Sequence, residues 1–182
     1  MAATSGIVNI VKFTSLAYAA SPSDATAPTT LTTVTDDQLK DGTFNIDIPK
    51  ASLTSDYLES GKVYGIRVGN VDPKISIGLA LATAKTISDL SEGTSLTAGT
   101  AGTAADKLKL GSGTPTAKYL YILATGLNSD GEEIKVEAFK ARPTYSWSGN
   151  MGRNQEPAPF TVEFSLLYHP AADCFATIEP KF

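Results

Sequence analysis

The sequence contains few of the residues on which catalytic and metal-binding sites most often depend. Its 182 residues include one cysteine, Cys174, and one histidine, His169. Structural zinc sites take several His or Cys ligands, so these two residues argue against one. A single cysteine also excludes an internal disulfide. The apolar stretch around Cys174 predicts a buried, unreactive thiol rather than a nucleophile.

Other catalytic and ligand-binding patterns are missing too. His169 precedes Pro170 at the end of a predicted strand, with no nucleophile-elbow context around any serine. The glycines at 111 and 113 are not followed by the Lys-Ser/Thr pair of a phosphate-binding loop. Residues 128–133 (NSDGEE) lack the ligand spacing of a calcium loop and predict a tight turn. We therefore expect no catalytic residues, no cofactor, no metal and no enzymatic activity.

Strong positive charge and long apolar runs are also missing. The formal net charge is -4, which gives little general attraction to nucleic acid. No run reaches the roughly 20 apolar residues that a membrane helix needs. Residues 16–20 (LAYAA) have the small-residue character of a signal-peptidase site. However, Lys12 interrupts the apolar run before them and no basic segment precedes it. We expect a soluble protein, synthesised in the cytoplasm and not associated with a membrane.

Alternating polar and apolar residues are the main feature that is present. Residues 160–169 and 133–140 follow a period of two, which is typical of half-buried strands. Residues 119–124 and 132–140 are joined through GLNSDG at 126–131, a pattern that predicts a hairpin. Further strands are predicted at 6–18, 43–48, 62–68, 74–81 and 174–178.

One short helix is predicted at residues 53–60, with Thr54 or Ser55 as its cap and Gly61 just beyond its end. Strands outnumber helices and show no alternating strand–helix rhythm. The fold class is therefore predicted to be all-β, an antiparallel sandwich or barrel with one short flanking helix and long loops. The chain has the length of a single domain, residues 1–182.

Two segments have the composition of loops. Residues 20–30 are rich in Pro, Ser, Thr and Ala, and predict a linker or arm. In residues 91–117, nineteen of twenty-seven residues are Gly, Ala, Ser or Thr. This second segment is either a flexible loop or an insertion that becomes ordered against a neighbouring subunit. Leu108 and Leu110 predict a small strand near its end.

A group of aromatic, methionine and arginine side chains lies between the two clearest strands. These residue types are enriched where proteins contact one another. Pro143, Gly149 and Gly152 are expected to break any strand and push the segment outward as a loop, although the aromatic residues could instead cap the core. The predicted subunit-interface residues are Arg142, Tyr145, Trp147, Met151 and Arg153.

The C-terminal part of the chain resembles the tail tube (major tail) proteins of tailed bacteriophages. The resemblance is carried by residues 132–141 (EEIKVEAFKA) and 159–168 (PFTVEFSLLY), a charged strand, a loop and a closing strand. The Thr-, Ala- and Gly-rich middle of the chain and its retained Met1 are also similar to virion proteins. These features cover about a third of the sequence.

The resemblance implies a virion structural protein located in the phage tail and without catalytic residues. Six subunits would form a ring as a homo-oligomer, and rings would stack head-to-tail into a tube, alongside other tail proteins. Phage DNA would pass through the lumen during ejection without specific binding. Segments 20–30 and 91–117 would join one ring to the next.

Two other functions remain open from the residues. A capsid decoration or other virion accessory protein would also be all-β, and would bind an assembled lattice without forming a polymer. A receptor- or glycan-binding module would use Trp147, Tyr145 and Tyr168 as stacking platforms.

Overall fold

The computed structural model describes residues 12–35, 38–39, 45–47, 53–57, 63–68, 72–80, 82–101, 103–111, 116–146 and 160–180. These residues form the following elements: β1 (Lys12–Ala20), β2 (Thr32–Thr35), β3 (Asn45–Asp47), β4 (Leu53–Tyr57), β5 (Val63–Val68), β6 (Lys74–Leu79), α1 (Ala84–Asp89), β7 (Thr94–Thr97), β8 (Lys107–Leu110), β9 (Leu120–Leu127), β10 (Glu133–Ser146), β11 (Phe160–Leu166) and β12 (Thr177–Pro180).

Eight strands form one antiparallel sheet. Its order is β2-β1-β9-β10-β11-β6-β3, and β12 pairs with β10 off this path. The hairpins β4–β5 and β7–β8 are separate two-stranded sheets. The predicted all-β antiparallel class with one short helix is confirmed. Within the described residues the large sheet does not close into a barrel, because β2 and β3 lie at opposite ends of its strand order.

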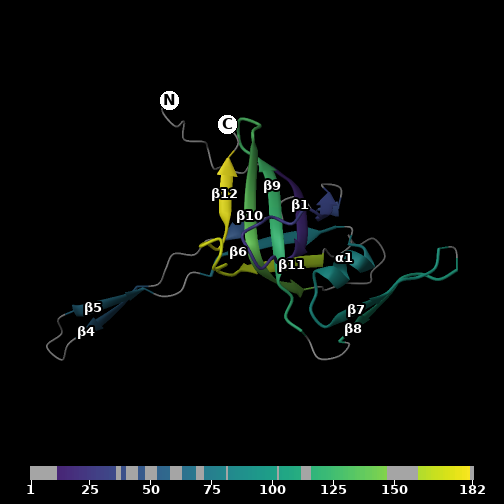
Figure 1. Cartoon of the computed structure of the whole chain (residues 1–182), viewed down its shortest axis with the longest axis horizontal. Helices are drawn as coiled ribbons and strands as arrows, with labels where there is room; N and C mark the ends of the chain where they lie inside the picture. Colours follow the sequence, from purple (N-terminus) through teal and green to yellow (C-terminus); the bar gives the residue numbers. More distant parts are fainter. Residues whose placement is uncertain are drawn as a thin grey trace, which may run out of the picture.

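The large sheet folds over itself because β10 changes neighbours part-way along its length. Its first half lies between β9 and β12, whereas residues from Ala141 to Ser146 pair with β11. The β9–β10 register shifts between Ala138 and Ala141. Such irregularities bend a strand and increase its twist. As a result, β6 and β11 run across β1, β9 and β10 in Figure 1.

The hydrophobic core lies between the two halves of the folded sheet. In β11 the side chains alternate strictly between buried and half-buried, as the sequence pattern predicts. Strand β6 likewise buries Ile75, Ile77 and Leu79. The core cluster combines residues of both halves, among them Leu16, Tyr18, Ile75, Ile77, Leu79, Ile122, Val136, Val162, Phe164 and Leu166.

The predicted hairpin between β9 and β10 is confirmed. Asn128 is buried, and its side-chain oxygen accepts hydrogen bonds from the backbone N–H groups of Asp130 and Glu132, at 2.9 and 2.8 Å. Its amide nitrogen donates to a carboxylate oxygen of Glu132 at 3.1 Å. Gly131 adopts φ 81°, a left-handed conformation that glycine accepts without steric cost. Local turn chemistry therefore accounts for the Asn, Asp and Gly of this segment.

The linker predicted at residues 20–30 contains no helix or strand beyond Ala20, the last residue of β1. Its first residues are held against the body of the protein. The Ser21 hydroxyl donates to the carbonyl of Phe139 at 2.8 Å, and the buried His169 ring donates from Nε2 to the carbonyl of Pro22 at 3.1 Å. His169 also forms an isolated β-bridge with Cys174. The strand predicted at 160–169 is β11, which ends at Leu166, so His169 lies beyond its end.

The predicted position of the helix is wrong. Within residues 53–60, the structure has strand β4, which pairs with β5. The observed helix is α1, whose first turn is capped by the Thr83 hydroxyl accepting from the N–H of Thr86 at 3.1 Å. Leu90, at the end of α1, is completely buried, and Ile87 packs against the core. Tertiary packing stabilises a helix of this length, because an isolated one would be marginal.

The other predicted strands correspond to observed ones with shifted ends. Strands β5, β6, β3 and β1 lie in the segments predicted at 62–68, 74–81, 43–48 and 6–18, and residues 6–11 fall outside the described residues. The closing strand predicted at 174–178 is β12, which begins only at Thr177. The small strand predicted around Leu108 and Leu110 is β8.

The segment 91–117 contains a second strand that the sequence did not reveal. Strand β7 pairs with β8 in register, with Leu96 opposite Leu108 and Thr94 opposite Leu110. Figure 1 shows the β7–β8 hairpin extending away from the large sheet on one side, next to α1, and the β4–β5 hairpin extending on the other.

Candidate assembly surfaces

The β7–β8 hairpin, which we call the arm, has one apolar and one polar face. Because side chains alternate along a strand, Thr94, Leu96, Leu108 and Leu110 share one face. The opposite face carries Ser95, Thr97, Lys107 and Lys109. Leu110 is 58% exposed, the largest exposure among the described large hydrophobic residues. A two-stranded hairpin alone is marginally stable in water, so an amphipathic arm of this kind is suited to a partner surface.

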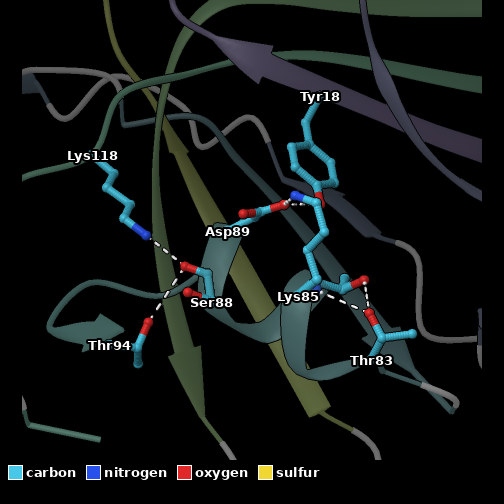
Figure 2. Close-up of polar contacts among 8 residues, drawn as sticks. Tyr18, Thr83, Lys85, Ser88, Asp89, Thr94 and Lys118 are labelled. Carbon is cyan, nitrogen blue, oxygen red and sulfur yellow. Dashed lines mark hydrogen bonds and ion pairs between the residues drawn. The ribbon is translucent and has the colours of Figure 1, made fainter. Parts of the chain in front are cut away.

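The base of the arm is held by α1 and the residues around it. The Tyr18 hydroxyl donates to a carboxylate oxygen of Asp89 at 3.1 Å, and Lys85 pairs with the same oxygen at 2.5 Å. Burial is the main cause that raises the pKa of Tyr18 above its ordinary value, with the Asp89 carboxylate adding to it. Figure 2 shows Tyr18, Lys85 and Asp89 converging above the helix. Asp89 thus ties the last turn of α1 to β1.

A second set of contacts fixes the start of β7. The carbonyl of Ser88 accepts from the ammonium group of Lys118 at 2.5 Å and from the hydroxyl of Thr94 at 3.4 Å (Figure 2). Glu92 accepts from the backbone N–H of Lys118 at 3.1 Å. The chain entering the arm is thereby tied to the segment that enters β9.

Arg142 adds a bidentate ion pair to this base. Its Nε and Nη2 atoms donate to the two carboxylate oxygens of Glu92, each at 2.9 Å. Paired donors of this kind fix geometry as well as charge. The hydrogen bond from Arg142 is the main cause that holds the pKa of Glu92 below its ordinary value. The arm therefore projects from a base anchored to β1, β10 and residue 118.

We predict that Arg142→Met lowers the melting temperature of the monomer in a pH-dependent way. A carboxylate whose folded pKa is lowered stabilises the fold above its ordinary pKa, and this stabilisation is lost as pH falls through the folded pKa. The difference in melting temperature between the wild type and Arg142→Met should therefore be full at pH 7. It should shrink below pH 4.5, the ordinary pKa of a glutamate side chain. Thermal melts between pH 7 and pH 3 measure it.

Glu92→Gln provides the matched control for this prediction. Because it removes the charge on the other partner, it should reduce the pH dependence in the same way as Arg142→Met. Combining the two substitutions should lower the melting temperature less than the sum of the single effects. A constant difference between wild type and Arg142→Met across the whole pH range would contradict the assignment.

Two of the five predicted interface residues, Arg142 and Tyr145, lie in the part of the chain that the structure describes. Arg142 and Tyr145 lie within β10 rather than in a loop, and Pro143 is a buried part of the same strand. Pro143 is tolerated because, beyond Ala141, β10 pairs only with β11 among the described strands, so a missing N–H can face the open side. The prediction that Pro143 breaks the strand is wrong. Trp147, Met151 and Arg153 lie outside the described residues.

The two described interface candidates have different environments. Tyr145 stacks on Phe160 with ring centroids 5.7 Å apart and packs against the core cluster. This contact supports the capping alternative for its ring. Arg142 is exposed but engaged with Glu92, so it contributes to the base of the arm.

An apolar groove is lined by residues of β3, β10, β11 and β12 and of the loops beside them. Its volume is about 290 Å³, and its floor includes Val136 and Leu166, which are otherwise buried core residues. Cys174 is half-buried in its wall, more accessible than the sequence predicts. The full lining is Ile46, Pro73, Val136, Leu166, Cys174, Phe175, Ala176 and Ile178.

Exposed apolar side chains mark one edge of this groove. Phe175 and Ile178 are 37% and 36% exposed, and Tyr168 contacts Phe175 edge-to-face at 5.9 Å between centroids. The hydroxyl of Tyr168 donates to a carboxylate oxygen of Asp173, and this hydrogen bond is the main cause that raises the pKa of Tyr168. The groove and the arm are two apolar surfaces that the described residues leave accessible.

No protein-family model matches this chain, and no curated protein is significantly similar to it. The described residues include no group of three or more His, Cys, Asp or Glu that could hold a metal ion. They also include no helix that is long and apolar enough to cross a membrane.

Sequence reasoning missed the two features that define these surfaces. The arm was hidden because β7 (TSLT) has a single large apolar residue, Leu96, whose partner Leu108 lies twelve positions away. The alternation of Lys107, Leu108, Lys109 and Leu110 was the available signal. The groove had no local signal, because its lining combines residues of β3, β10, β11 and β12, which are far apart in the sequence.

Proposed function

We propose that this protein is a structural subunit that assembles with copies of itself into a ring, and that such rings stack into the tail tube of a bacteriophage. The ring is a homo-oligomer of six subunits, and the assembly belongs to the virion, where it contacts other tail proteins. The protein performs no catalysis in this role. Its role is to provide complementary surfaces through which the subunits bind one another.

The arm is the observation that carries the proposal. It projects from the body, its base is fixed by Glu92, Asp89 and Ser88, and its apolar face ends in the exposed Leu110. A fixed base lowers the entropy lost when the arm is immobilised against a partner. In an isolated monomer the apolar face of the arm stays exposed to water and stabilises nothing. In an assembly the same face becomes buried against another subunit.

Open sheet edges offer a second means of assembly. Strands β2, β3 and β12 each pair with one neighbour within the described residues. Edges of this kind pair readily with other chains, and native proteins normally protect them. Closing a ring covers the edges of every subunit in turn, which is a natural solution for a sheet that does not close on itself.

The charge of the chain is compatible with a conduit for DNA. A net charge of -4 gives little general attraction to phosphates, so a genome could move through a lumen without being retained. The interior of the tube would then guide DNA by its shape during ejection.

Electron microscopy of the purified protein over a range of concentrations tests this proposal. Rings with a hollow centre, and stacked tubes at higher concentration, are the expected result, and light scattering should give a mass of six subunits for the ring. A protein that stays monomeric or trimeric at all concentrations, and that binds only assembled capsid shells, would instead be a decoration protein. Persistent monomers that bind neither shells nor tail components would refute both functions.

A further inference from the structure

The two strands of the arm are flanked by glycines in the left-handed conformation. Gly93 precedes β7 with φ 69°, and Gly111 follows β8 with φ 68°. Both glycines lie next to the first residue pair of the arm, because Thr94 is opposite Leu110 in the register. Glycine has more conformational freedom than any other residue. Each connection between the arm and the rest of the protein therefore passes through a residue that is suited to be a hinge.

The chain on the other side of Gly93 is fixed. Ser91 is completely buried. The Glu92 side chain, next to the glycine, is only 17% exposed and accepts hydrogen bonds with both carboxylate oxygens. Its Oε1 accepts from Nε of Arg142 at 2.9 Å and from the backbone N–H of Lys118 at 3.1 Å. Its Oε2 accepts from Nη2 of Arg142 at 2.9 Å. The fixed part of the chain thus ends at Glu92.

These hydrogen bonds join three segments of the chain at one carboxylate. Glu92 belongs to the segment that enters the arm, Lys118 to the segment between the arm and β9, and Arg142 to β10 of the large sheet. The ammonium group of Lys118 also donates to the carbonyl of Ser88 in α1, which Figure 2 shows beside the start of β7. A change at Glu92 therefore acts on the attachment of the arm to the sheet, whereas the bond between Lys118 and Ser88 is independent of it.

The hydrogen bonds of Thr94, the first residue of the arm, are long. Its hydroxyl lies 3.4 Å from the carbonyl oxygens of Ser88 and Ser91. Hydrogen bonds between oxygen atoms are usually 2.5–3.0 Å long, so these two are weak. By contrast, a bidentate pair between Arg and a carboxylate fixes direction as well as distance. The Glu92–Arg142 pair is therefore well suited to set the direction in which the arm leaves the sheet.

We propose that the arm is a hinged element that turns about Gly93 and Gly111, and that the Glu92–Arg142 pair locks it in the orientation used for assembly. Glu92 and Arg142 are thus positioning residues, which act by holding the arm. A locked arm loses less conformational entropy on binding than a free one. The hinge and the lock are properties of the single chain. Their effect on assembly rests on the proposed function.

Distances between spin labels test the lock in the monomer. Thr97→Cys on the arm and Ser129→Cys in the β9–β10 turn, both at exposed positions, carry the labels in a Cys174→Ser background. Pulsed electron paramagnetic resonance should give a narrow distance distribution when Glu92 is intact. Glu92→Gln keeps the size of the side chain and an oxygen for Lys118, but it removes the charge-assisted pair. The width of the distribution should then roughly double.

Arg142→Met and a second pair of labels are the matched controls. Arg142→Met removes the same pair from the other side and should broaden the distribution equally. The double variant with Glu92→Gln should be no broader than either single variant, because both substitutions remove one contact. Labels at Ser129 and Thr144 both lie on the β9–β10 hairpin, so their distribution should stay unchanged. Broadening of this second distribution would show that the substitutions loosen the sheet, which contradicts a lock on the arm.

Gly111→Asn tests the hinge itself. Asn adopts the left-handed conformation more readily than other residues with a side chain, and a Cβ at position 111 meets no atom within 4 Å. The substitution restricts rotation at one of the two glycines. Combined with Glu92→Gln, it should therefore narrow the broadened distribution between positions 97 and 129. If the distribution stays as broad, Gly111 is not part of the hinge.

Light scattering of the unlabelled variants tests the effect on assembly. The critical concentration of Glu92→Gln and of Arg142→Met should rise about 3- to 10-fold, because a free arm must be immobilised on binding. An arm that is freed without any rise would show that its orientation has no role in assembly. An unchanged distance distribution in both variants would refute the lock. If the wild type forms neither rings nor tubes, the proposed function falls, whereas the distance distributions still decide whether the hinge and the lock exist.

Discussion

Leu110→Asp is expected to abolish assembly while leaving the monomer folded. Leu110 is 58% exposed in the isolated subunit, so replacing it removes little packing from the fold itself. At an interface, losing a buried leucine costs about 1.5–3 kcal/mol, and burying an unpaired carboxylate costs more. At about 1.4 kcal/mol per factor of ten, the critical concentration should rise at least roughly 100-fold. Light scattering and negative-stain microscopy measure this rise.

Thr97→Asp is the matched control for this prediction. It adds the same charge to the same exposed hairpin, but on the polar face beside Ser95 and Lys107. Assembly should persist with a critical concentration within a few-fold of wild type. Circular dichroism spectra and melting temperatures of the two monomers should agree. If both variants assemble equally well, the apolar face of the arm has no part in assembly.

The alternation of side chains predicts the strands that matter most for the core. In β11 and β6 the buried side chains are the ones that the period of two selects, because one face of each strand packs against the other half of the sheet. The β9–β10 hairpin is likewise local, since Asn128 and Gly131 define its turn within a few residues. Features that are determined by residues close in the sequence are therefore predicted correctly.

The helix shows where local signals fail. Residues 53–60 carry helix-start and helix-end residues, yet β4 forms there because it pairs along its length with the strand at Val63–Val68. Helix α1 has a Thr83 cap and a Lys85–Asp89 pair, but these are worth little without the burial of Leu90 and the packing of Ile87. Over six residues, tertiary contacts outweigh propensity.

The candidate surfaces could be predicted only in part. Residue types identified Arg142 and Tyr145 as unusual, but not their roles, because β10 places Arg142 against Glu92, fifty positions away in the sequence. Composition identified residues 91–117 as a segment without a core, and two leucines indicated one of its strands. The groove is lined from four strands that are distant in the sequence, so no local pattern predicts it.

Phe164→Ala is expected to give the largest loss of monomer stability. Phe164 is completely buried in the middle of β11, opposite Pro143 on one neighbouring strand and Ile75 on the other. Truncation of a buried Phe costs about 3–5 kcal/mol, from lost transfer energy and from the cavity that remains. Since a domain is stable by about 5–15 kcal/mol, this is a large fraction. The melting temperature should fall by roughly 6–20 °C.

Thr144→Ala is the matched control for this prediction. It shows whether the loss of stability comes from the core or from any substitution in the sheet. Thr144 is exposed on β10 next to Pro143, and its removal should change the free energy of unfolding by less than about 0.5 kcal/mol. Urea titration of both variants under monomeric conditions provides the comparison. A Phe164→Ala cost below about 1.5 kcal/mol would mean that the two halves of the sheet do not enclose Phe164. The burial that keeps β11 and β6 across β1, β9 and β10 would then have to come from other residues.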